Sequence, residues 1–94
     1  MITKLIEMRF KTELTYAMKL QLEALMQGSR REQGCLQYDI YNHLSKANAI
    51  FFVEKWQSLE HLELHRIGPI VFQFKRELGD LIEDKIDMSV AGNG

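Results

Sequence analysis

His65 is the side chain of this sequence best suited to move a proton near neutral pH. It follows Leu62 by three residues on a predicted short helix, so it should lie near the buried side of that helix. A histidine held there could act as a general base. Two plainer roles stay open: a histidine on the helix surface, or one that only bonds a backbone carbonyl.

Glu54 and Trp56 share a side-chain parity with Ile50 and Phe52 on a predicted strand. If that parity faces the helices, a carboxylate and an indole line the space beside His65. A buried carboxylate next to a histidine is a frequent mark of a functional pocket. The alternative is a carboxylate at the end of a strand, paired with a Lys or Arg.

Hydroxyl and amide groups on the preceding strand could orient a carbonyl or phenol of a substrate. Tyr38, Tyr41 and Asn42 offer such groups, although a strand tyrosine is more often structural, with one end packed and the other in water. Cys35 lies beside flexible Gly34 and could be reactive. A lone cysteine is more often a small buried hydrophobic residue.

His61 and His65 have the i, i+4 spacing that could hold a metal on a helix. No third ligand is evident, so we predict no metal site. His61 and His43 are more simply solvated side chains. The sequence contains no Gly-rich phosphate loop, Cys-x-x-Cys, His-Glu-x-x-His or Gly-x-Ser-x-Gly, so no strong motif assigns another chemistry.

Hydrophobic periodicity predicts the elements that must position these groups. Alternation favours strands over residues 2–10, 35–42 and 50–56. Thr12 could cap a helix that starts near residue 13 and continues to about residue 31. The apolar residues that recur at helical spacing on it are Leu14, Met18, Leu22, Leu25 and Met26.

Two further helices and a last strand complete the predicted order. Ser58 can cap a short helix to about residue 67, and Gly68-Pro69 separates it from the next. The apolar stripe of that next helix consists of Val71, Phe74, Leu78, Leu81 and Ile82, and a last strand is indicated by the alternation of Ile86, Met88 and Val90. We therefore expect residues 1–94 to form one α+β domain, a ferredoxin-like β-α-β-β-α-(α)-β protomer with an antiparallel sheet.

The strand over residues 50–56 carries large apolar groups on both of its faces. One face should be covered by the helices, which leaves Phe51 and Val53 on the other. An exposed apolar patch there would be costly, so we predict a homodimer that packs sheet to sheet. The alternative is that Lys55, Tyr41 and Asp39 make this face polar enough for water.

Composition narrows the function classes. A chain of 94 residues with 46% hydrophobic residues is one small folded domain, and its net charge of −1 gives no general attraction for nucleic acid or an anionic membrane. The single cysteine excludes an intramolecular disulfide. No apolar run is long enough for a signal peptide or a membrane span, so we expect a cytoplasmic protein.

Three motifs stand out together: Glu32-x-Gly34-Cys35-x-x-Tyr38, Glu54-x-Trp56-x-Ser58, and His65 followed by Gly68-Pro69. In this order they resemble the antibiotic biosynthesis monooxygenase-like (ABM) family of dimeric α+β barrel proteins. The likeness covers roughly residues 2–88. It implies small dimers with ferredoxin-like protomers, some of which oxidise aromatic polyketides or quinols with molecular oxygen and no metal or flavin.

The sequence also departs from the pattern of that family. Gln33 stands where many members have a proline, which reduces the rigidity of the turn. Ile70 and Val71 follow Pro69 where members often carry a second histidine, so an activity that needs two histidines is disfavoured. The positions that haem-degrading relatives use hold other residues here, and we do not expect haem degradation.

The resemblance implies a cofactor-independent monooxygenase acting on a small aromatic, polyketide or quinol-like substrate. His65 would be the general base and Glu54 would orient it or balance its charge. Trp56 would form an apolar wall, and from their hydroxyl and amide groups we add Tyr38 and Asn42 as predicted substrate-binding residues. Two alternatives remain: a non-catalytic dimeric module that binds a small metabolite, or an isomerase or lyase acting on a small carbonyl compound.

Overall fold

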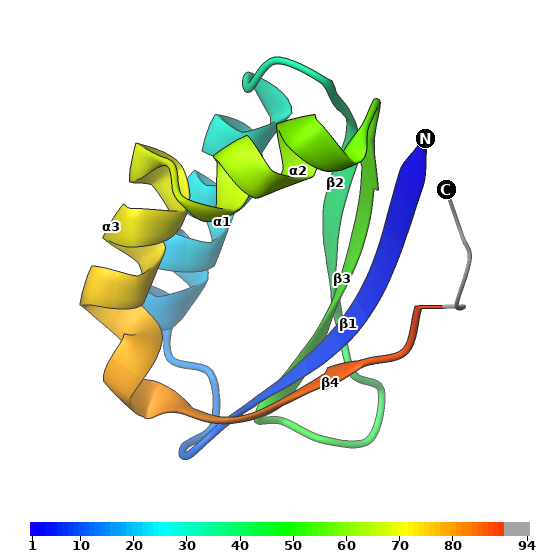
Figure 1. The fold of residues 1–94 in the computed structure, drawn as a ribbon. Coiled ribbons are helices and arrows are strands. Elements are labelled where there is room, and N and C mark those ends of the chain that lie inside the picture. The colour runs from blue at the N-terminus through cyan, green and yellow to red at the C-terminus, as the bar shows by residue number, and fades with distance from the viewer. Residues whose placement is uncertain (90–94) are drawn as a thin grey trace.

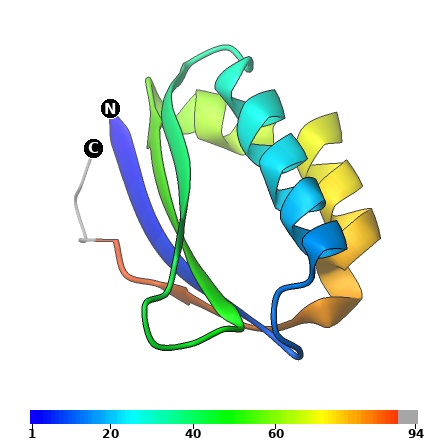
Figure 2. The ribbon, with the colours of Figure 1, turned by 180° about the vertical axis from the view of Figure 1, so that it is seen from behind.

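The computed structural model describes residues 1–89, in which three helices cover one face of a four-stranded sheet (Figure 1). All strand pairs are antiparallel and the strand order is β2-β3-β1-β4. The view from behind shows that none of the helices within residues 1–89 lies on the other face (Figure 2). This arrangement confirms the predicted α+β, ferredoxin-like order. The elements are β1 (Ile2–Phe10), α1 (Tyr16–Arg30), β2 (Cys35–Asn42), β3 (Ala49–Trp56), α2 (Leu59–Arg66), α3 (Pro69–Leu78) and β4 (Ile82–Asp87).

The first helix begins later than the sequence pattern indicates. Thr15, not Thr12, is the N-cap of α1, and its hydroxyl accepts a hydrogen bond from the Met18 backbone N–H at 3.2 Å. The hydroxyl of Thr12 instead donates to the Glu13 carbonyl. Two threonines precede the apolar stripe, and periodicity alone does not distinguish which of them caps the helix.

The last strand is also displaced from its predicted place. Leu81 ends a 3₁₀ turn (Gly79–Leu81), and Ile82 already pairs with Phe10 of β1, so neither belongs to the stripe of α3. Met88 follows β4, and Val90 lies outside the described residues. β4 is short and largely exposed, so its sequence carries little apolar alternation. The bounds of the strand are set instead by its pairing with β1.

The predicted parity of β3 is confirmed. Ile50, Phe52, Glu54 and Trp56 are buried on the helix side, while Phe51, Val53 and Lys55 on the other face are only half-buried. In β2 an irregularity between Cys35 and residue 37 changes the register against β3.

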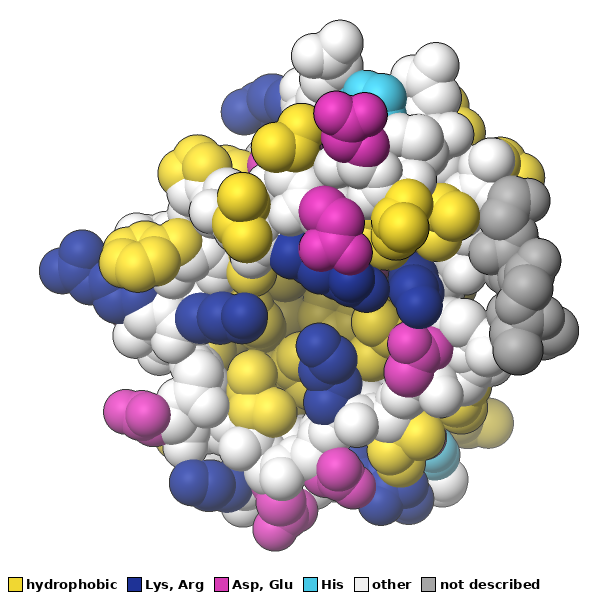
Figure 3. All heavy atoms as spheres, in the orientation of Figure 1, with side chains coloured by type: hydrophobic (Ala, Val, Ile, Leu, Met, Phe, Trp, Pro, Cys, Tyr) yellow, Lys and Arg dark blue, Asp and Glu magenta, His cyan; other side chains and the backbone are white. Residues whose placement is uncertain are grey.

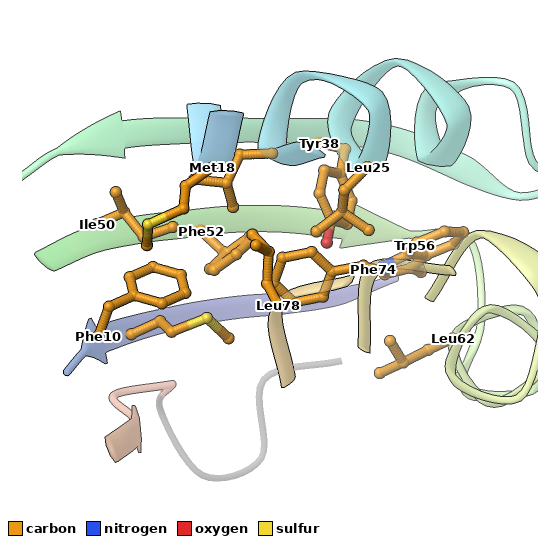
Figure 4. Close-up of a cluster of buried hydrophobic side chains, with 12 residues drawn as sticks. Phe10, Met18, Leu25, Tyr38, Ile50, Phe52, Trp56, Leu62, Phe74 and Leu78 are labelled. Atoms are coloured by element: carbon orange, nitrogen blue, oxygen red, sulfur yellow. The ribbon is translucent and has the colours of Figure 1, made fainter. Parts of the chain in front are cut away.

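The core lies between the helices and the inner face of the sheet (Figure 4). Its largest fully buried side chains include Phe10 and Trp56, which lie near opposite ends of the β1–β3 pair. Burial of this apolar surface is the main stabilising contribution to the fold. The buried cluster comprises Met8, Phe10, Met18, Leu22, Leu25, Tyr38, Ile50, Phe52, Trp56, Leu62, Phe74 and Leu78.

A turn at Gly34 fixes the start of β2 against the start of α2. Gly34 has φ +81°, which favours glycine, and a Cβ there would collide with the His61 ring. Its carbonyl accepts a hydrogen bond from the Gln57 N–H at 2.8 Å. Ser58 caps α2 as predicted, accepting from the His61 N–H at 3.3 Å. These contacts bring the α1–β2 loop beside α2.

Within residues 1–89, none of the helices is long and apolar enough to cross a bilayer.

Candidate active site

His65 is held on one side by a carboxylate from a distant part of the chain. It lies in the last turn of α2 with 5% of its surface exposed, and its Nδ1 is 2.5 Å from Oε1 of Glu32 in the α1–β2 loop. A carboxylate accepts hydrogen bonds, so we assign the Nδ1 proton to the histidine as donor. In a neutral ring this tautomer leaves the Nε2 lone pair free to accept a proton.

Glu54 lies on the other side of the same imidazole. It is 6% exposed, and its Oε1 is 3.9 Å from His65 Nε2, too far for a hydrogen bond but close enough for strong electrostatic attraction to an imidazolium. The Trp56 Nε1–H donates to the same oxygen at 3.0 Å. The imidazole is therefore flanked by two carboxylates, one of which is anchored by an indole.

Trp56 takes a different place from the predicted substrate wall. Its side chain is fully buried and does not line the cavity described below. Its ring centroid lies 4.6 Å from that of His65, with the planes inclined at 34°. Because the indole packs against His65 and bonds Glu54, it supports both groups from behind.

Tyr38 reaches the site from β2. Its ring is buried and meets the His65 ring edge-on at a centroid distance of 5.4 Å. Burial, and then the negative charge of Glu54, raise the pKa of the phenol well above its usual value. Its hydroxyl therefore stays protonated at physiological pH and can donate a hydrogen bond.

A cavity of about 260 Å³ opens beside these groups, between the sheet and helices α2 and α3. His65, Glu54 and Tyr38 all line it, and the rest of its interior is largely apolar. Figure 3 shows this face as a hydrophobic hollow with Lys and Arg side chains around it. The volume is slightly below the range of roughly 300–1,000 Å³ usual for drug-sized ligands, which suits a molecule of one or two rings. The apolar lining residues include Ile6, Met8, Leu25, Phe52, Leu62, Val71, Phe74 and Ile82.

Asn42 is not brought to this cavity. It is exposed at the far end of β2, where it lines a separate shallow hollow of about 170 Å³ together with Lys19 and Ile50. The strand is long enough to separate Asn42 from Tyr38 although both face the helix side. We therefore assign Asn42 no part in the His65 site.

Glu32 is the site residue that the residue-by-residue reasoning did not select. It stands directly after Arg30-Arg31 and resembles part of a charged helix end. The available signal was its place in the Glu32-x-Gly34 motif, in which the left-handed turn at Gly34 keeps the preceding loop close to α2.

The other candidate groups have structural roles. Burial, and then the charges of Glu32 and Glu54, raise the pKa of the half-buried Cys35 thiol, which disfavours a reactive thiolate. His61 is half-buried, and its Nδ1 lies 2.7 Å from the Ser58 hydroxyl. In the part of the chain that the structure describes, no group of three or more His, Cys, Asp or Glu side chains is placed to hold a metal ion.

The sequence profile of one family, described as antibiotic biosynthesis monooxygenase, matches residues 1–77. The chain belongs to this family. It is 27% identical over 74 residues to "Putative monooxygenase Rv0793" of Mycobacterium tuberculosis, a match that covers 79% of this chain and 72% of that protein. It is also 25% identical over 68 residues to an uncharacterised protein of Synechocystis, covering 72% of this chain but only 46% of that one.

Solved structures of the family have the same fold. A structure from Nitrosomonas europaea, described as a "Putative antibiotic biosynthesis monooxygenase", superimposes with a TM-score of 0.85 and covers 98% of each chain at 18% identity. At that identity the likeness establishes the architecture alone. The predicted membership of the family is thus confirmed by the profile, and the predicted fold by the structures.

Proposed function

We propose that this protein is a cofactor-independent monooxygenase acting on a small aromatic, polyketide or quinol-like substrate. One observation carries the proposal: His65 is held through Nδ1 by Glu32, with Nε2 on the side of Glu54 and an apolar cavity. Membership of the family and the likeness to Rv0793 favour oxygen chemistry over other uses of a buried base.

His65 would act as the general base of the reaction. Its Nε2 would take the proton of a substrate hydroxyl, and the resulting imidazolium would be stabilised by Glu32 and Glu54. The electron-rich ring anion would then form a carbon–oxygen bond with molecular oxygen. Loss of water from the hydroperoxide leaves a carbonyl. In the keto tautomer of the substrate the reacting ring carbon is a CH₂, so one CH₂ and one O₂ become one C=O and one H₂O without an external reductant.

The surrounding residues would support this chemistry in two ways. The protonated hydroxyl of Tyr38 can donate a hydrogen bond to a substrate oxygen inside the cavity. The apolar walls, including Phe52 and Phe74, would limit the access of water to a reactive anion.

Oxygen uptake with a panel of dihydroxynaphthalenes and quinols tests the proposal. We expect His65→Ala to reduce the enzyme-dependent rate by at least about 100-fold, the usual contribution of a general base. His65→Gln is the matched variant, because its amide can still donate to Glu32 but cannot take up a proton. If His65→Gln folds normally and retains the wild-type rate, His65 is not the base.

A non-catalytic module that binds a small metabolite is the second candidate. It is favoured by the residues that follow Pro69, since apolar Val71 lines the cavity and His65 is the only histidine to do so among the described residues. A substrate analogue that raises the melting temperature, with no oxygen consumed across the panel, would support this alternative.

We further propose that two copies pack through the outer faces of their sheets. Leu5, Tyr41 and Ile86 are exposed on this face of the single chain, next to half-buried Phe51 and Val53. The register places these residues side by side, because Leu5 pairs with Val53 and Tyr41 with Phe51. A second copy is the simplest cover for such a patch.

Sedimentation equilibrium tests the dimer directly. We expect the wild-type mass to be twice that of one chain and Leu5→Lys to shift the protein toward monomer. Leu44→Lys in the β2–β3 loop is the matched control, since Leu44 is fully exposed away from the sheet. A wild-type protein that stays monomeric at high concentration would contradict the proposal.

A further inference from the structure

Four cationic side chains, each from a different element, line the cavity. Lys4 comes from β1, Arg66 from α2, Lys75 from α3 and Lys85 from β4. Figure 3 shows Lys and Arg side chains around the hydrophobic hollow. The whole chain has a net charge of −1, so this concentration of positive charge is a local property of the cavity mouth.

Two of the four cations have carboxylate partners. Lys4 Nζ lies 3.2 Å from Asp87 Oδ2, and Arg66 pairs with Glu63 at 3.1 Å. Lys75 and Lys85 have no ion-pair partner within residues 1–89. Both are exposed, and they approach the mouth from opposite layers, one from the helices and the other from the sheet.

The interior of the cavity has the opposite electrostatic character. Its buried carboxylate is Glu54, which lies beside His65 and accepts a hydrogen bond from Trp56, and most of the other interior groups are apolar. An anionic group that entered this region would be repelled by Glu54 and would lose its hydration. At the mouth the same group would stay hydrated and would be attracted by Lys75 and Lys85.

From this polarity we infer that the substrate is an anionic aromatic compound, in which a hydroxylated ring enters the cavity and a carboxylate-like substituent stays at the mouth between Lys75 and Lys85. The inference rests on the proposed function for the identity of the reacting ring. To that function it adds that the substrate is negatively charged and that its uncharged end enters the cavity first. The hydroxyl end would then point toward His65, because the charged end is kept outside.

Calorimetric binding of two matched ligands tests the charge preference without any turnover. The ligands are 6-hydroxy-2-naphthoate and 2-naphthol, which share a ring system and a hydroxyl and differ by the carboxylate, which lies at the opposite end of the ring system from the hydroxyl. We expect the naphthoate to bind at least about tenfold more tightly at low salt, since one charge pair at contact in water corresponds to about fivefold and two lysines face the carboxylate. The preference should fall when the salt is raised from about 20 mM to about 300 mM.

Variants of the two unpaired lysines identify the groups responsible. Lys75→Met with Lys85→Met should weaken naphthoate binding by about tenfold or more and change naphthol binding by less than about twofold. Lys19→Met with Lys46→Met is the matched control, because neither lysine lines the cavity and the pair makes the same change in charge. Equal binding of the two ligands to the wild type, or an equal loss of both in the double variant, would overturn the inference.

Oxygen uptake with 1,4-dihydroxy-2-naphthoate and 1,4-dihydroxynaphthalene separates this inference from the proposed function. A charge preference in binding with no enzyme-dependent uptake would support the anionic ligand and refute the monooxygenase. Uptake with equal kcat/KM for both compounds would support the monooxygenase and refute the anionic substrate.

Discussion

Replacing Glu32 by Gln changes the charge next to His65 while keeping the shape of the side chain. In the wild type, Glu32 Oε1 lies 2.5 Å from His65 Nδ1. The amide oxygen of Gln can still accept the Nδ1–H bond, so the orientation of the ring and its tautomer are expected to persist. The negative charge that stabilises the protonated ring is lost.

The size of the effect follows from the contact and its exposure. A hydrogen bond to a charged group contributes about 1.5–3 kcal/mol. The Glu32 side chain is 21% exposed, so water screens it in part and the lower end of the range applies. A loss of about 1.5–2 kcal/mol in the transition state lowers kcat roughly 10- to 30-fold. Glu32 does not line the cavity, so KM should change by less than about twofold.

Steady-state oxygen uptake at saturating substrate measures this prediction. Glu23→Gln serves as the control, since Glu23 is exposed on α1 and lies at the other hollow. A Glu32→Gln enzyme with wild-type kcat would show that the carboxylate only supports the fold. A rise in KM with unchanged kcat would show that Glu32 acts in substrate binding, which would refute the positioning role.

Three further predictions concern the fold. Gly34→Ala introduces a Cβ at φ +81° that collides with His61, and differential scanning calorimetry should show a melting temperature lower by roughly 10 °C. Phe10→Ala removes a fully buried ring, and urea unfolding should show a loss of about 3–5 kcal/mol. Hydrogen bonds from Ser89, with Lys4 nearby, lower the pKa of Asp87 from 3.8 to about 2. The contribution of this carboxylate to the stability of the fold is therefore complete above about pH 4 and is lost as the pH falls toward 2. Its side chain is 47% exposed, so Asp87→Asn should remove less than about 1 kcal/mol of pH-dependent stability in that window.

Much of the fold could be predicted because its elements have clear local patterns. Alternation marked β1 and β2 with the observed bounds, and the dense aromatic run marked β3 to within one residue. The shared face of Glu54 and Trp56 followed from the period of two in a strand, and the structure decided that this face meets the helices. The errors lie where local signals compete: at the two threonines before α1, and at β4, which pairing with β1 defines.

The sequence by itself determined which side chains share a face of each strand or helix, because side-chain direction repeats along the chain with a fixed period. It therefore placed Glu54 and Trp56 on one face of β3 and selected His65 on α2, while the structure showed that this face meets the helices. Contacts between elements carry no such period, and only the tertiary structure decided them. It paired His65 with Glu32 across 33 residues, and it placed Trp56 behind the site.

The cluster of positive charge at the cavity mouth also depends on contacts between elements, which the sequence does not reveal. Lys4, Arg66, Lys75 and Lys85 are scattered through the sequence and show no cluster there. They converge because β1 and β4 are neighbours in the sheet and α2 and α3 pack above it. Asn42, four residues after Tyr38 and facing the same side, is excluded because the strand extends away from the site. Distance along the chain and distance in space are unrelated for such residues, so folding alone establishes which groups meet.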